Sequence, residues 1–244
     1  MESNNLLTAA GFVALTAVCF LLVYRELKAA IGKTTWTADR KQSITRRFNM
    51  SLGLWTVFVL AVSSTGFFSD FSSFPPRIMI VLVVPLITLI LVSFRSKAVD
   101  ELLQVIPSRN ILRLQVFRVF VEILLWACFV QNLLPVQMTF EGRNFDILSG
   151  VLGIVAAYSF TENRKARYAY NFIGLGLLIN IVTVAILSMP TPFRVFMNEP
   201  SNTLVTKVPF ILLPAMLVPL AYGLHFLSLR QLKLTAKTRD SAFD

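Results

Sequence analysis

The chain has 244 residues, of which 55% are hydrophobic and only 15% are charged, and its formal net charge is +10. About a quarter of the residues of soluble domains are charged, so this composition excludes an ordinary soluble domain and favours an integral membrane protein. Both cysteines, Cys19 and Cys128, lie inside apolar runs, which favours small core residues over a disulfide framework or a metal site.

Seven apolar runs follow one another along the chain, most of them near the ~20 residues that a helix needs to cross a ~30 Å hydrocarbon core. They lie near residues 5–24, 50–69, 77–94, 111–134, 145–160, 170–189 and 208–230. Alternation with period two is absent, so the runs are predicted to be helices. Because no Gly/Ser-rich linker divides them, we expect an all-α bundle of seven transmembrane helices that forms a single domain over residues 1–244.

The charges between the runs predict the orientation of this bundle. Eighteen of the 23 lysines and arginines fall in the first, third and fifth loops and the C-terminal tail. The positive-inside rule therefore places the N-terminus outside and the C-terminus in the cytoplasm, in the inner (plasma) membrane of the cell. The basic loops are expected to contact anionic inner-leaflet lipid, and no basic patch with interleaved aromatic residues suggests a nucleic-acid partner.

The fourth run, "RLQVFRVFVEILLW", carries polar residues at spacings of three and four. This spacing places Gln115, Arg118 and Glu122 on one helix face and predicts an i,i+4 ion pair between Arg118 and Glu122. Glu122 falls near the middle of the membrane, where an ionisable side chain is costly, so the face is expected to point into the bundle. Two interpretations remain open: a neutralised pair that orders helix packing, and a pathway for a solute or a proton.

A charged stretch, "MTFEGRNFDILSG", lies between the fourth and fifth runs at residues 138–150. It is predicted to form a short outer hairpin in which Gly142 adopts a positive φ and Asn144 or Asp146 caps the fifth helix. One interpretation is a salt-bridged turn that fixes the two helices; the other is an extracellular site in which Arg143 holds an anion. The hairpin residues of interest are Glu141, Arg143, Asn144 and Asp146.

The seventh run contains prolines at its centre. Pro214 and Pro219 each remove a backbone hydrogen bond, which predicts a bent helix whose carbonyls near Phe210 and Ala215 must be reached by neighbours or water.

The only histidine, His225, lies in the same run. Counted at 1.5 Å per residue, it lies about 8 Å from the cytoplasmic boundary and Arg118 about 10 Å, so the two share a depth. We expect a polar chamber between the fourth and seventh helices, which Tyr170 at the start of the sixth helix helps to complete. Its predicted members are Gln115, Arg118, Glu122, Tyr158, Asn171 and His225.

The charged stretch, the preceding "LQVFRVFVEILLW" and the terminal "LHFLSLRQL" resemble a family of uncharacterised bacterial seven-span membrane proteins, in which similar stretches recur at similar places. The resemblance covers about residues 113–150 and the last run. It implies the same membrane fold and assigns no activity.

Catalytic chemistry finds little support in the sequence. Depth counting places Ser149 roughly 18 Å from His225 along the membrane normal, too far for a Ser/His dyad. One histidine is too few for a zinc hydrolase or a bis-histidine haem, so no metal or cofactor is expected. The sequence therefore favours a protein, transporter-like or receptor-like, that binds or transports a small solute. The alternatives are a non-catalytic membrane partner or sensor subunit, and an intramembrane enzyme without a recognisable motif.

Overall fold

The computed structural model describes the backbone of residues 2–240 and the side chains of residues 5–236. Within this part the chain is all-helical and contains no β-strand. The α-helices are α1 (Glu2–Lys33), α2 (Ala38–Ser64), α3 (Met79–Arg95), α4 (Lys97–Val105), α5 (Ser108–Leu114), α6 (Phe117–Val130), α7 (Ile147–Ser159), α8 (Arg164–Leu187) and α9 (Val218–Asp240). Short 3₁₀ turns are η1 (Phe67–Ser69), η2 (Val136–Met138) and η3 (Leu204–Thr206), and η4 (Leu213–Leu217) is a π-helical turn.

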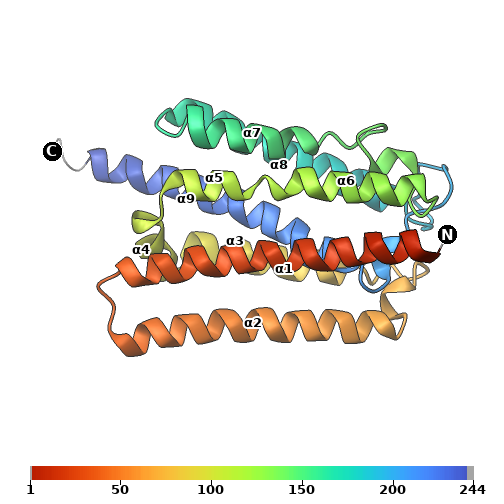
Figure 1. The fold of residues 1–244 in the computed structure, drawn as a ribbon, viewed down its shortest axis with the longest axis horizontal. Helices are drawn as coiled ribbons and strands as arrows, with labels where there is room; N and C mark the ends of the chain where they lie inside the picture. The colour runs from red at the N-terminus through yellow and green to blue at the C-terminus, as the bar shows by residue number, and fades with distance from the viewer. Residues whose placement is uncertain (1, 241–244) are drawn as a thin grey trace.

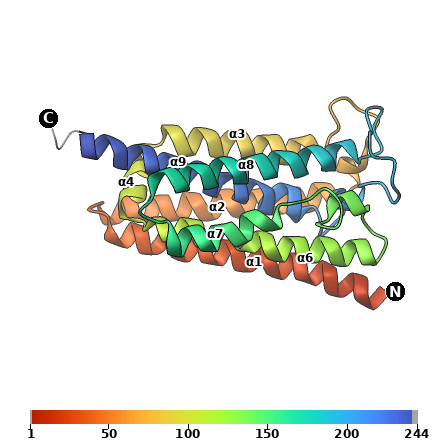
Figure 2. The same cartoon turned by 90° about the horizontal axis from the view of Figure 1, so that it is seen from above.

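The helices form an up-and-down bundle of parallel and antiparallel rods (Figures 1 and 2). Each predicted apolar run lies on one rod: α1, α2, α3, α5 with α6, α7, α8, and η4 with α9. The last rod is the most central, because α9 packs against α3, α4, α5 and α8. Consecutive rods alternate in direction, so the first, third and fifth connections lie at the same end as the C-terminal part of α9 (Figure 1).

The number of membrane-crossing helices is less clear than the number of rods. By length and composition, three helices could cross a membrane, Asn5–Lys33, Arg164–Leu187 and Leu213–Ala236, or four if α3 and α4, bent by 73°, form one span. The fourth run is divided between α5 and α6, and α7 covers only about 20 Å at 1.5 Å per residue. The all-helical prediction is confirmed, whereas seven spans remain a prediction.

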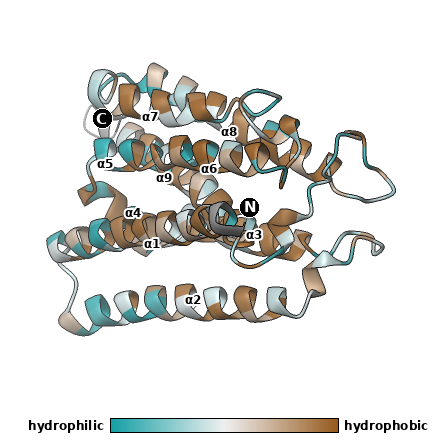
Figure 3. Cartoon of the chain, turned by 45° about the vertical axis from the view of Figure 1, so that its right-hand side comes forward, coloured by the Kyte–Doolittle hydropathy of each residue, from teal (hydrophilic) through white to brown (hydrophobic). Residues whose placement is uncertain are grey.

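Large apolar side chains cover the outside of the bundle. Leu7, Leu54 and Phe172 are more than 60% exposed, and Figure 3 shows hydrophobic residues along the length of the helices, with hydrophilic ones gathered toward one end. Soluble monomers rarely expose contiguous apolar surface on this scale, so the pattern indicates association with a membrane.

The proline-containing rod departs from regular α-helix near Pro214. Its first part forms the π-helical turn η4, in which some backbone groups lose their regular α-helical partners. The Phe210 carbonyl accepts a hydrogen bond from the Leu213 amide at 3.0 Å, and the Ala215 carbonyl accepts one from Trp55 Nε1 of α2, also at 3.0 Å. Neighbouring groups therefore satisfy both carbonyls that the prolines free.

Candidate functional site

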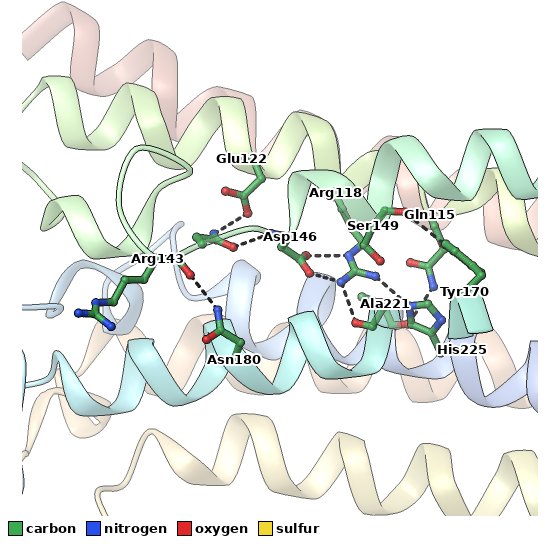
Figure 4. Close-up of polar contacts among 12 residues, drawn as sticks. Gln115, Arg118, Glu122, Arg143, Asp146, Ser149, Tyr170, Asn180, Ala221 and His225 are labelled. Carbon is green, nitrogen blue, oxygen red and sulfur yellow. Dashed lines mark hydrogen bonds and ion pairs between the residues drawn. The ribbon is translucent and has the colours of Figure 1, made fainter. Parts of the chain in front are cut away.

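A buried ion pair between Arg118 and Asp146 forms the centre of the polar interior (Figure 4). Arg118 is 1% exposed; its Nε donates to Asp146 Oδ2 at 2.7 Å and its Nη2 donates to the other carboxylate oxygen and to the Gly174 carbonyl. The predicted pair with Glu122 is therefore wrong. The hairpin folds back so that Asp146 lies beside the guanidinium, where a carboxylate can accept two parallel hydrogen bonds, the geometry that arginine favours.

His225 of α9 lies on the other side of the same guanidinium. Its Nε2 is 2.8 Å from Arg118 Nη1, and its Nδ1 is 2.9 Å from Asn171 Oδ1. Because a guanidinium can only donate, Nε2 is the acceptor and Nδ1 carries the proton that is donated to Asn171. Asn171 in turn donates to Ser228 Oγ at 2.9 Å. The fully buried chain of contacts thus links α6, α8 and α9.

Two other predicted chamber residues lie around this network. Gln115 is 1% exposed and donates through Nε2 to the Ala221 carbonyl at 3.2 Å. Tyr170 donates to the Ser149 carbonyl at 3.3 Å, and its ring centroid is 5.4 Å from that of His225.

Tyr158 does not belong to the interior. It is 61% exposed, and the Arg109 guanidinium lies 5.0 Å above its ring. The physical reason is helix periodicity, because Ala156 and Ala157 occupy the inward face of α7 at this level and turn Tyr158 outward.

The structure also brings Ser149 close to His225, although depth counting along the sequence had placed them far apart. A Cβ atom on Gly174 would lie 2.5 Å from His225 Nε2 and 2.7 Å from Ser149 Oγ, so those two atoms are within about 5 Å of each other. The expected separation is wrong because the segment before α7 dips into the bundle: Thr139 and Asn144 are fully buried, and α7 starts below the level assumed for a surface hairpin.

This proximity does not create a Ser/His dyad. The lone pair of His225 Nε2 already accepts from Arg118, and Ser149 Oγ has no hydrogen-bond partner within the described residues. A serine nucleophile needs a free base within hydrogen-bond reach. The arrangement therefore orders packing rather than activating a hydroxyl.

The charged hairpin differs from its prediction as well. Glu141 accepts from Trp126 Nε1 at 2.6 Å, whereas the Arg143 guanidinium lies 5.1 Å above the Phe196 ring. No ion pair joins Glu141 and Arg143 in the described part of the chain. The ion pair of the hairpin is instead made by Asp146, which joins it to Arg118 of α6. The backbone carbonyl of Arg143 instead accepts from Asn180 of α8 at 2.8 Å (Figure 4).

Glycine and asparagine have different roles in this hairpin from those predicted. Gly142 does not have a positive φ; its Cα lies so close to the Val136 carbonyl that an added Cβ would be 2.3 Å from the oxygen. Asn144 accepts from the Asp146 amide through Oδ1 at 3.1 Å, which is an Asx turn rather than a cap inside α7. The Asp146 side chain makes no cap either.

Glu122 lies one helical turn from Arg118, beside this asparagine. Its side chain is buried; Oε1 accepts from Asn144 Nδ2 at 2.6 Å, and Oε2 has no hydrogen-bond partner among the described residues. Glu122 and Asp146 are the acidic residues on the wall of a pocket of about 90 Å³ between α3, α6, α8 and η4. The rest of the wall is apolar, and Leu178 and Pro214 are typical members.

The predicted single chamber is therefore divided into two parts. Arg118, Asn171 and His225 form a packed hydrogen-bond network, and His225 does not line the pocket. Glu122 faces the pocket instead, and Asp146 borders both parts. The described residues contain no cluster of side chains that could hold a metal ion.

Fold and site together define an all-helical, membrane-associated bundle with a buried arginine network beside an apolar pocket. A family model described as a domain of unknown function, DUF8737, matches residues 75–233 and covers α3 through most of α9. The chain therefore belongs to the DUF8737 family. No curated protein and no solved structure matches it.

Proposed function

We propose that this chain is a seven-span membrane protein that binds or transports a small solute in the pocket between α3, α6, α8 and η4. The observation that carries the proposal is Glu122 Oε2, which has no partner among the described residues and lies on a wall that is apolar apart from Glu122 and Asp146. An ionisable side chain inside a membrane is costly, and it is normally retained where it serves a function.

The chemistry of the two acids indicates what the solute offers. Asp146 already receives two hydrogen bonds from Arg118, whereas Glu122 receives one from Asn144 and leaves an oxygen free. A solute with a positive charge or hydrogen-bond donors would complete that carboxyl group. One water needs roughly 15 Å³ of such a volume, so about 90 Å³ accommodates several waters or a small organic group.

The membrane placement rests on the alternation of the rods and on the basic end of the bundle. With the N-terminus outside, the cations of the first, third and fifth connections meet the cytoplasmic leaflet of the inner membrane, where anionic lipid is their partner. The exposed apolar side chains between the ends are then covered by lipid tails.

The test is ligand stabilisation of the detergent-purified protein. A panel of alkali cations and small primary, secondary and quaternary amines should contain a member that raises the unfolding temperature, since ligand at 100 times its Kd stabilises by about 2.7 kcal/mol. Glu122→Gln should abolish the stabilisation. Glu141→Gln is the matched control, because it makes the same change at an exposed carboxyl outside the pocket, and it should leave the stabilisation intact.

Two outcomes would contradict the proposal. Stabilisation that survives in Glu122→Gln would place the solute elsewhere. The absence of any stabilising member would favour the alternative of a non-catalytic partner or sensor subunit, whose basic loops hold it to lipid or to another protein.

A further inference from the structure

A second hollow, which we call the outer groove, lies on the outside of the bundle between α1, α6 and α7. It has a volume of about 310 Å³ and is lined mainly by apolar side chains, among them Leu15, Val18, Leu22 and Phe120. Val18 and Phe120 are each 52% exposed, so the groove opens outward from the bundle. It shares no lining residue with the interior pocket. The helix α6 lies between the two and contributes different residues to each.

Charged side chains occur at only one end of the outer groove. There, Arg113 of α5 donates to Glu26 Oε1 at 2.7 Å, and Asn110 donates to Glu26 Oε2 at 2.7 Å. The Arg113 side chain is 44% exposed, so guanidinium donors not used by Glu26 remain reachable from outside. This end coincides with the basic end of the bundle, where α1 finishes and α5 begins (Figure 1).

A more open hollow of about 710 Å³ adjoins this charged end. Its wall includes Arg109, Asn110 and Asn163, and it shares Tyr158 with the outer groove. The Arg109 Nε donates to the Ala157 carbonyl at 3.1 Å, which holds the cation at the rim. Glu162 lines the open hollow as well, so two arginines and two glutamates gather where groove and hollow meet. The guanidinium donors of Arg113 and Arg109 that no acid uses are the groups there that can donate to a phosphate.

The dimensions of the outer groove match those of one membrane leaflet. From Leu15 to Glu26, α1 rises about 16 Å at 1.5 Å per residue. Half of a ~30 Å hydrocarbon core is about 15 Å. The apolar part of the groove therefore has the length of a lipid tail, and its charged end lies at the depth of a headgroup.

We propose that the outer groove binds one anionic phospholipid, with an acyl chain along α1 and α6 and the phosphate beside Arg113 and Arg109. The inference uses the membrane placement proposed above but not the interior pocket, so either can fail alone. Phosphate accepts parallel hydrogen bonds from a guanidinium, and the apolar wall excludes water from the chain.

Native mass spectrometry of the full chain tests this proposal directly. Protein stripped of lipid in mild detergent and then supplied with phosphatidylglycerol should retain one molecule, and it should retain phosphatidylcholine much less. Val18→Trp fills the groove and should remove the adduct. Val57→Trp is the matched control, because Val57 is 67% exposed on α2, outside the groove, and its replacement should leave the adduct unchanged.

Two outcomes would show ordinary annular lipid and overturn the proposal. One is equal retention of phosphatidylglycerol and phosphatidylcholine, and the other is an adduct that persists in Val18→Trp.

Discussion

The substitution Asp146→Asn tests whether the buried ion pair holds the bundle together. It keeps the shape of the side chain and removes the negative charge that faces Arg118. Because Arg118 is 1% exposed, its charge would stay in the interior without a compensating carboxylate. Breaking a buried pair from one side costs about 3–5 kcal/mol. For a chain of this length, 1 kcal/mol corresponds to about 2–4 °C, so the unfolding temperature should fall by roughly 10 °C.

The double change Arg118→Leu with Asp146→Leu should be less damaging than Asp146→Asn. It removes both charges, and apolar replacement of a whole buried pair is often close to neutral. What remains is the loss of the donor to His225 Nε2 and to the Gly174 carbonyl, about 1–3 kcal/mol for buried groups left unpaired.

The assay is thermal unfolding of the detergent-purified variants, read by intrinsic fluorescence. Asp70→Asn is the control, because it breaks an ion pair with Arg77 that lies at the surface, and the unfolding temperature should not change. If Asp146→Asn melts within about 2 °C of the wild type, or if the double variant is the less stable one, the reasoning from an uncompensated buried charge fails.

Two further predictions concern packing and topology. Gly174→Ala should destabilise the protein by about 1–3 kcal/mol, because the added Cβ would lie 2.4 Å from the His225 ring. Gly176→Ala, whose Cβ would have no neighbouring atom within 4 Å, should be neutral or stabilising in the same thermal assay. Equal effects of the two substitutions would refute the clash. In intact cells, an impermeant maleimide should label a cysteine introduced at the exposed residue Asn198 and not one at Thr35; the reverse pattern would overturn the orientation.

Sequence reasoning succeeded where periodicity within one helix decides the outcome. Spacings of three and four place Gln115, Arg118 and Glu122 on a buried face of the fourth rod, and all three are 1% exposed. The prolines of the last rod predicted which carbonyls, those of Phe210 and Ala215, lose their regular helical partners. These features depend on the geometry of a single helix, which the order of residues specifies.

Depth counting placed Arg118 and His225 together, and they lie 2.8 Å apart, but the other contacts between rods did not follow from the sequence. Spacing showed that Arg118 needed a partner but not that residue 146, rather than 122, supplies it, because that choice depends on how the hairpin folds back. Depth counting assumed that the hairpin lay at the membrane boundary, and this assumption separated Ser149 from His225. One signal of this fold was present in the sequence. Asn144 and Asp146 directly precede an apolar helix, and two polar side chains at such a place need hydrogen-bond partners.

The contribution of Ser228 and Gly174 to the network was missed entirely. Ser228 gives no pattern of its own, since a single serine in an apolar helix usually bonds to its own backbone. Gly174 admits the His225 ring through a close approach that becomes visible only when α8 and α9 are docked.

The two buried acids, Glu122 and Asp146, have different roles in the site. Asn144 joins them, because its Nδ2 donates to Glu122 and its Oδ1 accepts from the Asp146 amide. Asp146 is held by two hydrogen bonds from Arg118, and through that guanidinium it is tied to α6, α8 and α9. Among the described residues, Glu122 receives a hydrogen bond from Asn144 alone. A solute that binds Glu122 therefore has to compete with one hydrogen bond and can leave the ion pair intact, so the pocket can respond to a ligand while the network keeps the helices in place.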